Sequence, residues 1–337
     1  MDLAELNRVA NFLVAPGKGV LAADESAGTV KKRFDVIGVE CTEDNRRDYR
    51  ELLFRSSEAM KSYISGVILF DETLRQKAKD GTPLAKIISD AGSLPGIKVD
   101  AGTKPLQFCP GEVVTEGLDK LPDRVKEYVG LGAKFAKWRA VITIGEDMPS
   151  STCIDANCHA LARYAALCQE AGIVPMVEPE VLMDGSHDIE VCYDVTEVTL
   201  RSLFASLYEH NVMLEGTILK ASMVIAGKDC PEQAAVEEVA EATVRCLKAS
   251  VPASLPGIVF LSGGQSDEQA TAHLNAMNQM GPHPWPLSFS YGRAMQSAAL
   301  KLWAKDMKAN FAEAQKTVAA RARDNGLAAL GQWKKSA

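Results

Sequence analysis

The sequence predicts an α/β fold, a single (β/α)8 TIM barrel, from two observations. Eight short apolar runs, most of them starting just after Gly or Pro, alternate with longer stretches of helical periodicity. The chain between successive runs always leaves room for a helix and a return, which is the repeating unit of such a barrel. The runs lie at 19–24, 66–70, 96–100, 134–138, 173–179, 216–220, 257–261 and 286–290.

The stretches between the runs show the spacing of amphipathic helices. One helix is predicted to follow Pro149 and Ser150 and to stop at Gly172, which can adopt the left-handed conformation that ends helices. Two further helical faces are formed by Leu118, Leu121, Val125 and Tyr128, and by Leu200, Leu203, Phe204 and Leu207.

A doubly wound parallel sheet is the main alternative fold. It requires a G-x-G-x-x-G turn after the first strand, and the segment that follows 19–24 has no such turn. No low-complexity linker or charge run divides the chain. We therefore expect one barrel domain over residues 1–337, with a short C-terminal tail.

The composition limits what the protein binds and where it works. The 337 residues include 37 Lys and Arg against 44 Asp and Glu, a net charge of −7, which disfavours general binding of nucleic acid or of an anionic membrane. No apolar run approaches the ~18 residues of a membrane helix, and the N-terminus lacks the features of a signal peptide. The eight cysteines form no C-x-x-C pair, which is typical of reduced, mostly buried thiols in a cytoplasmic protein.

Polar residues stand at the ends of seven of the eight runs, where a barrel has its active site. Taken singly, each of these residues fits a structural role as well as a functional one: a solvated surface residue, part of a turn, or a salt bridge on the outer face. Period two, however, places Lys137 and Arg139 on one face of their strand, and Glu178 and Glu180 on one face of theirs. The candidate residues are Asp24, Lys98, Lys137, Arg139, Glu178, Glu180, Lys220, Ser262, Gly263, Gly264, Ser290, Gly292 and Arg293.

Three lysines that converge on one barrel mouth favour imine chemistry. Mutual repulsion and desolvation make it costly to keep Lys98, Lys137 and Lys220 all charged, so we expect one of them to be neutral near pH 7 and to attack a carbonyl. Glu178 or Glu180 can then move protons while the carbinolamine loses water.

Glycine-rich segments after the last two runs suit phosphate. LSGGQS (261–266) and SYGRA (290–294) lie where barrels often hold phosphate through backbone N–H groups. Arg293 favours this interpretation over plain tight turns, because a guanidinium binds phosphate with two hydrogen bonds. Lys98 and Arg139 offer a second phosphate locus across the mouth. The predicted substrate is a ketone or aldehyde with phosphate at one or both ends.

Two other kinds of active site fit the sequence less well. A metal site needs His or carboxylate ligands at workable spacing, and the five histidines are scattered without an H-x-x-x-H pair. A retaining glycosidase needs two close carboxyls, and Glu178 and Glu180 have Cα atoms roughly 6.6 Å apart on one strand. That reading leaves the lysines and the glycine-rich segments unexplained. We expect neither a metal nor another cofactor.

In these same segments the sequence resembles the class I fructose-1,6-bisphosphate aldolases. The similarity extends over nearly the whole chain, in the order of the family. The matching strings are GKGVLAADES (17–26), NRRDYRELL (45–53), GVILFDETL (66–74), GIKVD (96–100), AKFAKWR (133–139), ARYAALCQEAGIVPMVEPE (162–180), LEGTILK (214–220), GIVFLSGGQS (257–266) and FSYGRA (289–294).

The resemblance implies a role for each matching residue. Lys220 is expected to form the Schiff base, Glu178 to act as acid and base, and Glu180 to support the lysine. Asp24 and Lys137 are expected to handle the substrate hydroxyls and to assist carbon–carbon cleavage. Ser26, Thr29, Arg33, Lys98 and Arg139 are expected near the six-phosphate, and Ser262, Gly263, Gly264, Ser290, Gly292 and Arg293 around the one-phosphate.

The activity implied is the reversible cleavage of fructose 1,6-bisphosphate to dihydroxyacetone phosphate and glyceraldehyde 3-phosphate, by a metal-independent homotetramer of glycolysis and gluconeogenesis. The chain ends in GQWKKSA, without the terminal tyrosine of animal members, so we expect another group to protonate the enamine or that step to be slower. Two alternatives stay open: another Schiff-base sugar-phosphate aldolase or transaldolase, and a non-catalytic barrel used as a binding scaffold.

Overall fold

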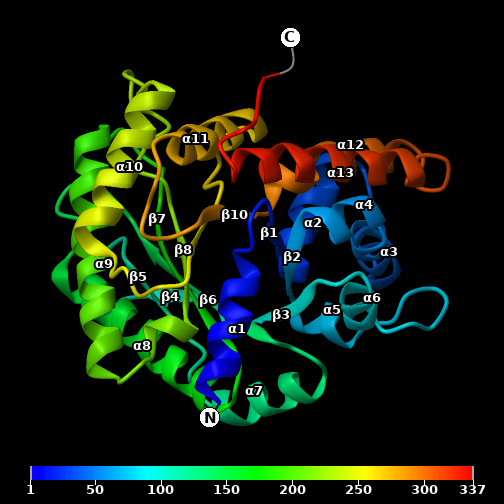
Figure 1. Ribbon diagram of the computed structural model, residues 1–337, viewed down its shortest axis with the longest axis horizontal. Helices are drawn as coiled ribbons and strands as arrows, with labels where there is room; N and C mark the ends of the chain where they lie inside the picture. The colour runs from blue at the N-terminus through cyan, green and yellow to red at the C-terminus, as the bar shows by residue number, and fades with distance from the viewer. Residues whose placement is uncertain (1, 336–337) are drawn as a thin grey trace.

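Eight parallel strands close into a barrel in the computed structural model, which describes residues 2–335 (Figure 1). The order around the barrel is β1-β10-β9-β8-β7-β6-β3-β2. Each predicted run overlaps one of these strands, so the prediction of a (β/α)8 TIM barrel is confirmed. The strands are β1 (Gly19–Ala23), β2 (Ile64–Leu69), β3 (Leu94–Lys98), β6 (Phe135–Ile142), β7 (Val174–Val181), β8 (Ile218–Ala221), β9 (Ile258–Phe260) and β10 (Leu287–Tyr291).

Helices surround the barrel and cover its outer face (Figure 1). A short antiparallel hairpin, β4 (Thr103–Pro105) with β5 (Val113–Thr115), follows β3 and lies outside the barrel. The helices are α1 (Leu3–Leu13), α2 (Ala27–Val36), α3 (Glu43–Phe54), α4 (Ser57–Ser62), α5 (Asp71–Arg75), α6 (Leu84–Asp90), α7 (Leu121–Gly130), α8 (Ser151–Glu170), α9 (Ile189–Glu209), α10 (Val236–Ser250), α11 (Asp267–Gln279), α12 (Arg293–Lys305) and α13 (Phe311–Ala328), with a 3₁₀ turn at Leu214–Gly216.

Local signals explain where the predicted helices start and stop. Helix α8 begins where the Ser150 side chain accepts a hydrogen bond from the Cys153 N–H, and it ends before Gly172, whose φ is +78°. The four predicted apolar residues of α9 are buried. Helix α7 starts later than its apolar pattern, at Leu121, because Lys120 takes a left-handed conformation with φ of +55° and Leu118 lies in the preceding turn.

Helix α1 closes the N-terminal end of the barrel. The apolar residues of this helix, Leu6, Val9, Ala10 and Leu13, form one buried cluster with side chains of the barrel strands, including Phe135, Val174 and Ile218. Asp2 caps the helix, and the Ser65 hydroxyl donates to the carbonyl of Leu13, which ties the helix to the start of β2. Buried apolar side chains therefore fill this end of the barrel interior, and the cavity described below lies at the other end.

Strands β6 and β7 extend beyond their predicted runs. The apolar pattern breaks at Arg139 and at Glu178, but the ladder continues and pairs Arg139 with Glu178 and Val141 with Glu180. The charged residues of these strands are thus held by regular backbone hydrogen bonds and do not lie in loops.

None of the helices within residues 2–335 has the length and hydropathy that crossing a bilayer requires. All eight cysteines are free thiols, and five of them are buried, as the sequence predicts.

Candidate active site

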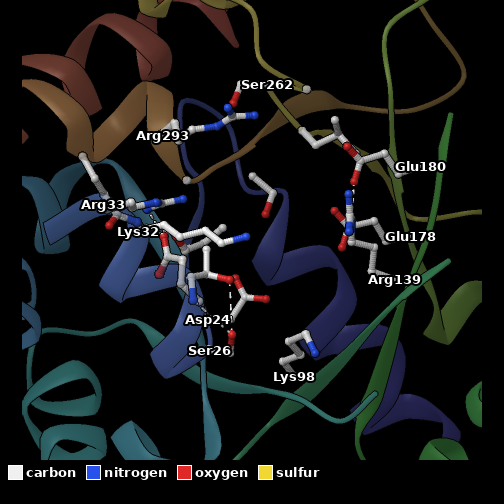
Figure 2. Close-up of a pocket in the computed structure, with 18 of the residues that line it drawn as sticks. Asp24, Ser26, Lys32, Arg33, Lys98, Arg139, Glu178, Glu180, Ser262 and Arg293 are labelled. Carbon is white, nitrogen blue, oxygen red and sulfur yellow. Dashed lines mark hydrogen bonds and ion pairs between the residues drawn. The ribbon is translucent and has the colours of Figure 1, made fainter. Parts of the chain in front are cut away.

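The C-terminal ends of the strands surround a cavity of about 720 Å³, bordered on one side by α2 and α12 (Figure 2). Every predicted site residue except Gly264 lines this cavity. Gly264 lies just behind the wall, where a Cβ on it would be 3.5 Å from a guanidinium nitrogen of Arg293. The structure therefore brings together residues that the sequence spreads from position 24 to position 293.

Two lysines and two carboxylates form the centre of the cavity. Lys220 Nζ lies 2.9 Å from Glu178 Oε1, and Lys137 Nζ lies 3.1 Å from the other oxygen of the same carboxylate. Lys137 also lies 2.7 Å from Asp24 Oδ2. All four side chains are at most 12% exposed, so these ion pairs are largely shielded from water.

A second layer of paired charges continues toward the hairpin side. Arg139 forms an ion pair with Glu180, and Figure 2 shows this pair on the side of the cavity opposite Arg33. Lys98 is paired with Asp100, whose carboxylate also accepts hydrogen bonds from the backbone N–H groups of Gly102 and Arg139. Asp100 thus joins β3 to β6.

Three of these four groups, Asp24, Lys137 and Glu178, are charged at neutral pH. Burial opposes the ionisation of Asp24, but Lys137 and Lys220 outweigh it and hold the pKa of the carboxyl well below its usual range. Burial likewise opposes the charge on Lys137, while Asp24 and Glu178 raise the pKa of its ammonium group above its usual value. The pKa of Glu178 is lowered, because the two lysines outweigh its burial.

This arrangement corrects the expectation that three lysines repel one another's charge. Lys98, Lys137 and Lys220 each have a carboxylate within ion-pair distance, so the centre is a balanced array. For Lys137 the effect on the pKa is the opposite of the one expected.

The rim of the cavity carries groups suited to anions. Lys32, Arg33, Arg293 and Lys301 line it. The Ser290 hydroxyl is buried in the wall and has no hydrogen-bond partner among residues 2–335. In the loop after β9, Gly263 and Gly264 have φ of +58° and +102°, a backbone conformation that other residues rarely adopt.

The N-terminus of α2 also faces the cavity. Ser26 caps this helix through its hydroxyl, which lies 3.2 Å from the Thr29 hydroxyl. A helix N-terminus with hydroxyl groups beside it favours a bound anion.

Several cavity residues escaped the sequence analysis. Asp100 follows Lys98 by two positions, so the same period-two argument that paired Lys137 with Arg139 could have found it. Glu25 and Gln296 carried no comparable signal, because neither ends an apolar run on the inward face.

Within residues 2–335, no three side chains among His, Cys, Asp and Glu are grouped as a metal ion would require. The fold and the site together define a class of protein: barrel enzymes whose reacting centre is a buried lysine next to a carboxylate, inside a cavity with a cationic rim.

Comparisons with known proteins identify the family. The family model for class-I fructose-bisphosphate aldolase matches residues 5–337. A probable fructose-bisphosphate aldolase class 1 from Xanthomonas campestris is 69% identical over 99% of this chain and 100% of its own length. Fructose-bisphosphate aldolase 1 of Toxoplasma gondii is 54% identical over 98% of this chain and 91% of its own. A solved structure of fructose-bisphosphate aldolase from Plasmodium falciparum, in a ternary complex with TRAP and an inhibitor, is 47% identical, with a TM-score of 0.97 over 99% of this chain and 96% of that one.

The chain therefore belongs to the class I fructose-bisphosphate aldolase family. It is a lyase that cleaves fructose 1,6-bisphosphate reversibly to dihydroxyacetone phosphate and glyceraldehyde 3-phosphate through a lysine Schiff base, and the resemblance found in the sequence is confirmed.

Proposed function

We propose that Lys220 is the lysine that forms the Schiff base and that Glu178 is its acid and base. The observation that carries this proposal is the 2.9 Å contact between Lys220 Nζ and Glu178 Oε1 on adjacent strands, with both side chains buried in the cavity. Lys220 reacts as the neutral amine, and Glu178 is placed to take up its proton. After attack on carbon 2, the same carboxyl returns a proton to the hydroxyl that leaves as water.

Asp24 and Lys137 act on the carbon–carbon bond. The protonated imine on Lys220 accepts the electron pair of the carbon-3/carbon-4 bond when the carbon-4 hydroxyl gives its proton to the Glu178 carboxylate, which is ionised again once water has left. Asp24 stays ionised in its buried ion pair, so it is able to accept a hydrogen bond from a substrate hydroxyl at this point. Lys137 holds both Asp24 and Glu178 and thereby fixes the distance between the two carboxyls. Glu180 supports the site through Arg139.

The two phosphates bind different groups of cavity residues. The one-phosphate is placed among Ser262, Gly263, Gly264, Ser290, Gly292 and Arg293, where positive-φ glycines and a free buried hydroxyl favour close approach of an anion. The six-phosphate is placed near Ser26, Thr29, Arg33, Lys98 and Arg139. Two separated cationic loci favour a bisphosphate over a monophosphate ketose.

The setting proposed for this activity follows the family. We propose a cytoplasmic enzyme that forms a homotetramer from one barrel domain per chain. A relative from Arabidopsis thaliana, 53% identical over 98% of this chain, is named a cytosolic aldolase, which supports the location.

Borohydride trapping of the full chain with dihydroxyacetone phosphate tests the assignment of the lysine. Borohydride reduces an imine to a stable amine, so peptide mass mapping should find the adduct on Lys220. The Lys220→Ala variant should give no adduct, whereas Lys126→Ala, which removes an exposed lysine from α7, should give the full amount.

An adduct on Lys98 or Lys137 in the native protein would contradict the assignment. Treatment with EDTA should leave both trapping and cleavage unchanged, because the proposed steps use only side chains of the protein. A loss of activity that added zinc restores would contradict the whole imine proposal.

A further inference from the structure

The segment NRRDYRELL (45–53) is similar to the family but has no part in the site described above. It forms most of α3, outside the barrel in the connection from β1 to β2. Two of its side chains nevertheless reach the cavity wall from behind. Tyr49 donates a hydrogen bond of 2.7 Å to Gln296 Oε1, and Arg50 Nη2 lies 2.6 Å from Glu25 Oε2. Both Gln296 and Glu25 line the cavity.

Glu25 is shared between two arginines. Its second oxygen forms an ion pair with Arg33. The two guanidinium groups differ in access: the Arg50 side chain is 2% exposed and does not line the cavity, whereas the Arg33 side chain is 23% exposed and does. Figure 2 shows Arg33 at the edge of the cavity, on the same side as Arg293. Of this pair, only Arg33 is able to touch a ligand.

The charges of the three groups do not cancel. Burial opposes the ionisation of Glu25, but Arg50 and then Arg33 lower the pKa of its carboxyl. One carboxylate next to two guanidiniums leaves one net positive charge. The guanidinium of Arg50 cannot contact a ligand, because it is buried and paired with Glu25. Its Cζ lies 5.7 Å from the centroid of the Tyr49 ring. The excess charge is thus available at Arg33.

We propose that Arg50 is a positioning residue for substrate binding, which keeps Glu25 in a fixed ion pair so that Arg33 retains its charge for a substrate phosphate. This inference rests on the proposed function, in which Arg33 lies near the six-phosphate. Without Arg50, the Glu25 carboxylate would neutralise Arg33 and hold its guanidinium against the wall. The segment of α3 that is similar to the family thus acts on phosphate binding from outside the barrel, through the ion pair of Arg50 with Glu25.

Steady-state kinetics with three variants of the full chain test the proposal. Arg50→Gln should raise KM for fructose 1,6-bisphosphate by about tenfold, the loss expected for a weakened charge-assisted contact. Its KM for fructose 1-phosphate, which lacks the six-phosphate, should change little, as should kcat for both substrates. Glu25→Gln/Arg50→Gln removes both buried charges and leaves Arg33 unpaired, so KM for the bisphosphate should return toward the native value. Glu25→Gln alone should not raise it.

Controls separate the electrostatic effect from damage to the fold. Arg47→Gln changes a residue of the same helix that pairs with Asp44 and Asp48, which lie on that helix too, so it should leave KM unchanged. Thermal unfolding of each variant shows whether it is folded. If Arg50→Gln does not fold, Arg50→Met, which keeps most of the apolar bulk of the side chain and removes its charge, takes its place with the same expected results.

Three results would overturn the inference: an unchanged KM in Arg50→Gln, an equal rise in KM for both substrates, or a double variant no better than Arg50→Gln. Arg33→Gln distinguishes this failure from a failure of the proposed function. If Arg33→Gln raises KM for the bisphosphate but Arg50→Gln does not, only the role of Arg50 is wrong. If Arg33→Gln has no effect, the assignment of the phosphate locus is wrong.

Discussion

The two ends of the barrel interior are built from the same strands but from opposite kinds of residue. Along β6 the inward face changes from Phe135 at the closed end to Lys137 and then Arg139 at the open end. Along β7 it changes from Met176 to Glu178. A step of two residues, about 6.6 Å along a strand, therefore separates an apolar side chain from a charged one on the same face.

This contrast assigns stability to one end and chemistry to the other. The apolar end is closed by α1, and the burial of its apolar side chains stabilises the folded state. At the charged end, ionised side chains are buried away from water, which destabilises the fold. Their ion pairs offset this cost only when every partner is present. Substitutions at the charged end should therefore lower kcat, and substitutions at the apolar end should lower the free energy of unfolding.

The largest effect is expected at the charged end, from Glu178→Gln. The amide retains the size of the carboxyl but cannot accept a proton from Lys220, so kcat should fall by about 10²–10⁴-fold. Initial rates of cleavage measure this loss. A matched control is Glu190→Gln, which changes an exposed glutamate on α9 and should leave kcat unchanged. A fall in kcat of less than about tenfold would show that another group moves the protons.

At the apolar end, Leu13→Ala should affect stability and spare the rate. Leu13 is fully buried between α1 and the barrel, so its truncation should lower the free energy of unfolding by about 2–5 kcal/mol. Denaturant titration measures this change, while kcat per folded molecule should equal the native value. Leu3→Ala on the same helix, where Leu3 is 44% exposed, should change stability by no more than about 0.5 kcal/mol. A large drop in kcat for Leu13→Ala would show that the two ends are coupled.

A smaller effect is expected from pH on the loop side of the open end. His273 is buried on α11, with its Nδ1 2.6 Å from Gln265 Oε1, and burial lowers its pKa to about 4. Because the folded pKa lies below the unfolded value of about 6.5, the histidine stabilises the fold above that pH. This contribution should be lost as the pH falls from about 6.5 to about 4, by up to about 1.4 kcal/mol for each pH unit.

Stability measured against pH in His273→Asn tests this expectation. The variant should lose the part of the acid sensitivity that His273 causes, and its curve should be flatter between these two pH values. Equal slopes in the native protein and the variant would contradict the assignment. Leu13→Ala, in contrast, should shift the curve down without changing its slope.

The fold was predictable because strand boundaries follow from local residues. Glycine and proline punctuate the eight apolar runs, and the strands lie where those runs predict. The lengths of β6 and β7 were not predictable in the same way, because charged residues such as Arg139 and Glu178 end an apolar pattern without ending a backbone ladder. The role of α1 also escaped prediction, since an amphipathic face does not say which surface it covers.

The site was predictable where inward residues share a strand end, as for Lys137 and Lys220. The pairing of their charges was not. Sequence places three lysines at one mouth, but only the structure shows that Asp24, Asp100 and Glu178 lie between them and reverse the expected effect on Lys137. The contribution of Arg50 was not predictable either, because it lies on an outer helix and only the structure shows that it contacts Glu25.

The neighbour of β1 in the barrel is β10, with Val20 opposite Ser290. During synthesis β1 therefore has no partner on one side until β10 has been made. Until residue 291 is added, any sheet that the growing chain forms is open and has two unpaired edges. The strand that removes those edges also delivers Ser290, and Arg293 follows it at the start of α12. Closure of the barrel thus brings two of the anion-binding groups to the cavity at the same stage of folding. A nascent chain stopped before that point has neither a sealed sheet nor a full set of anion-binding groups.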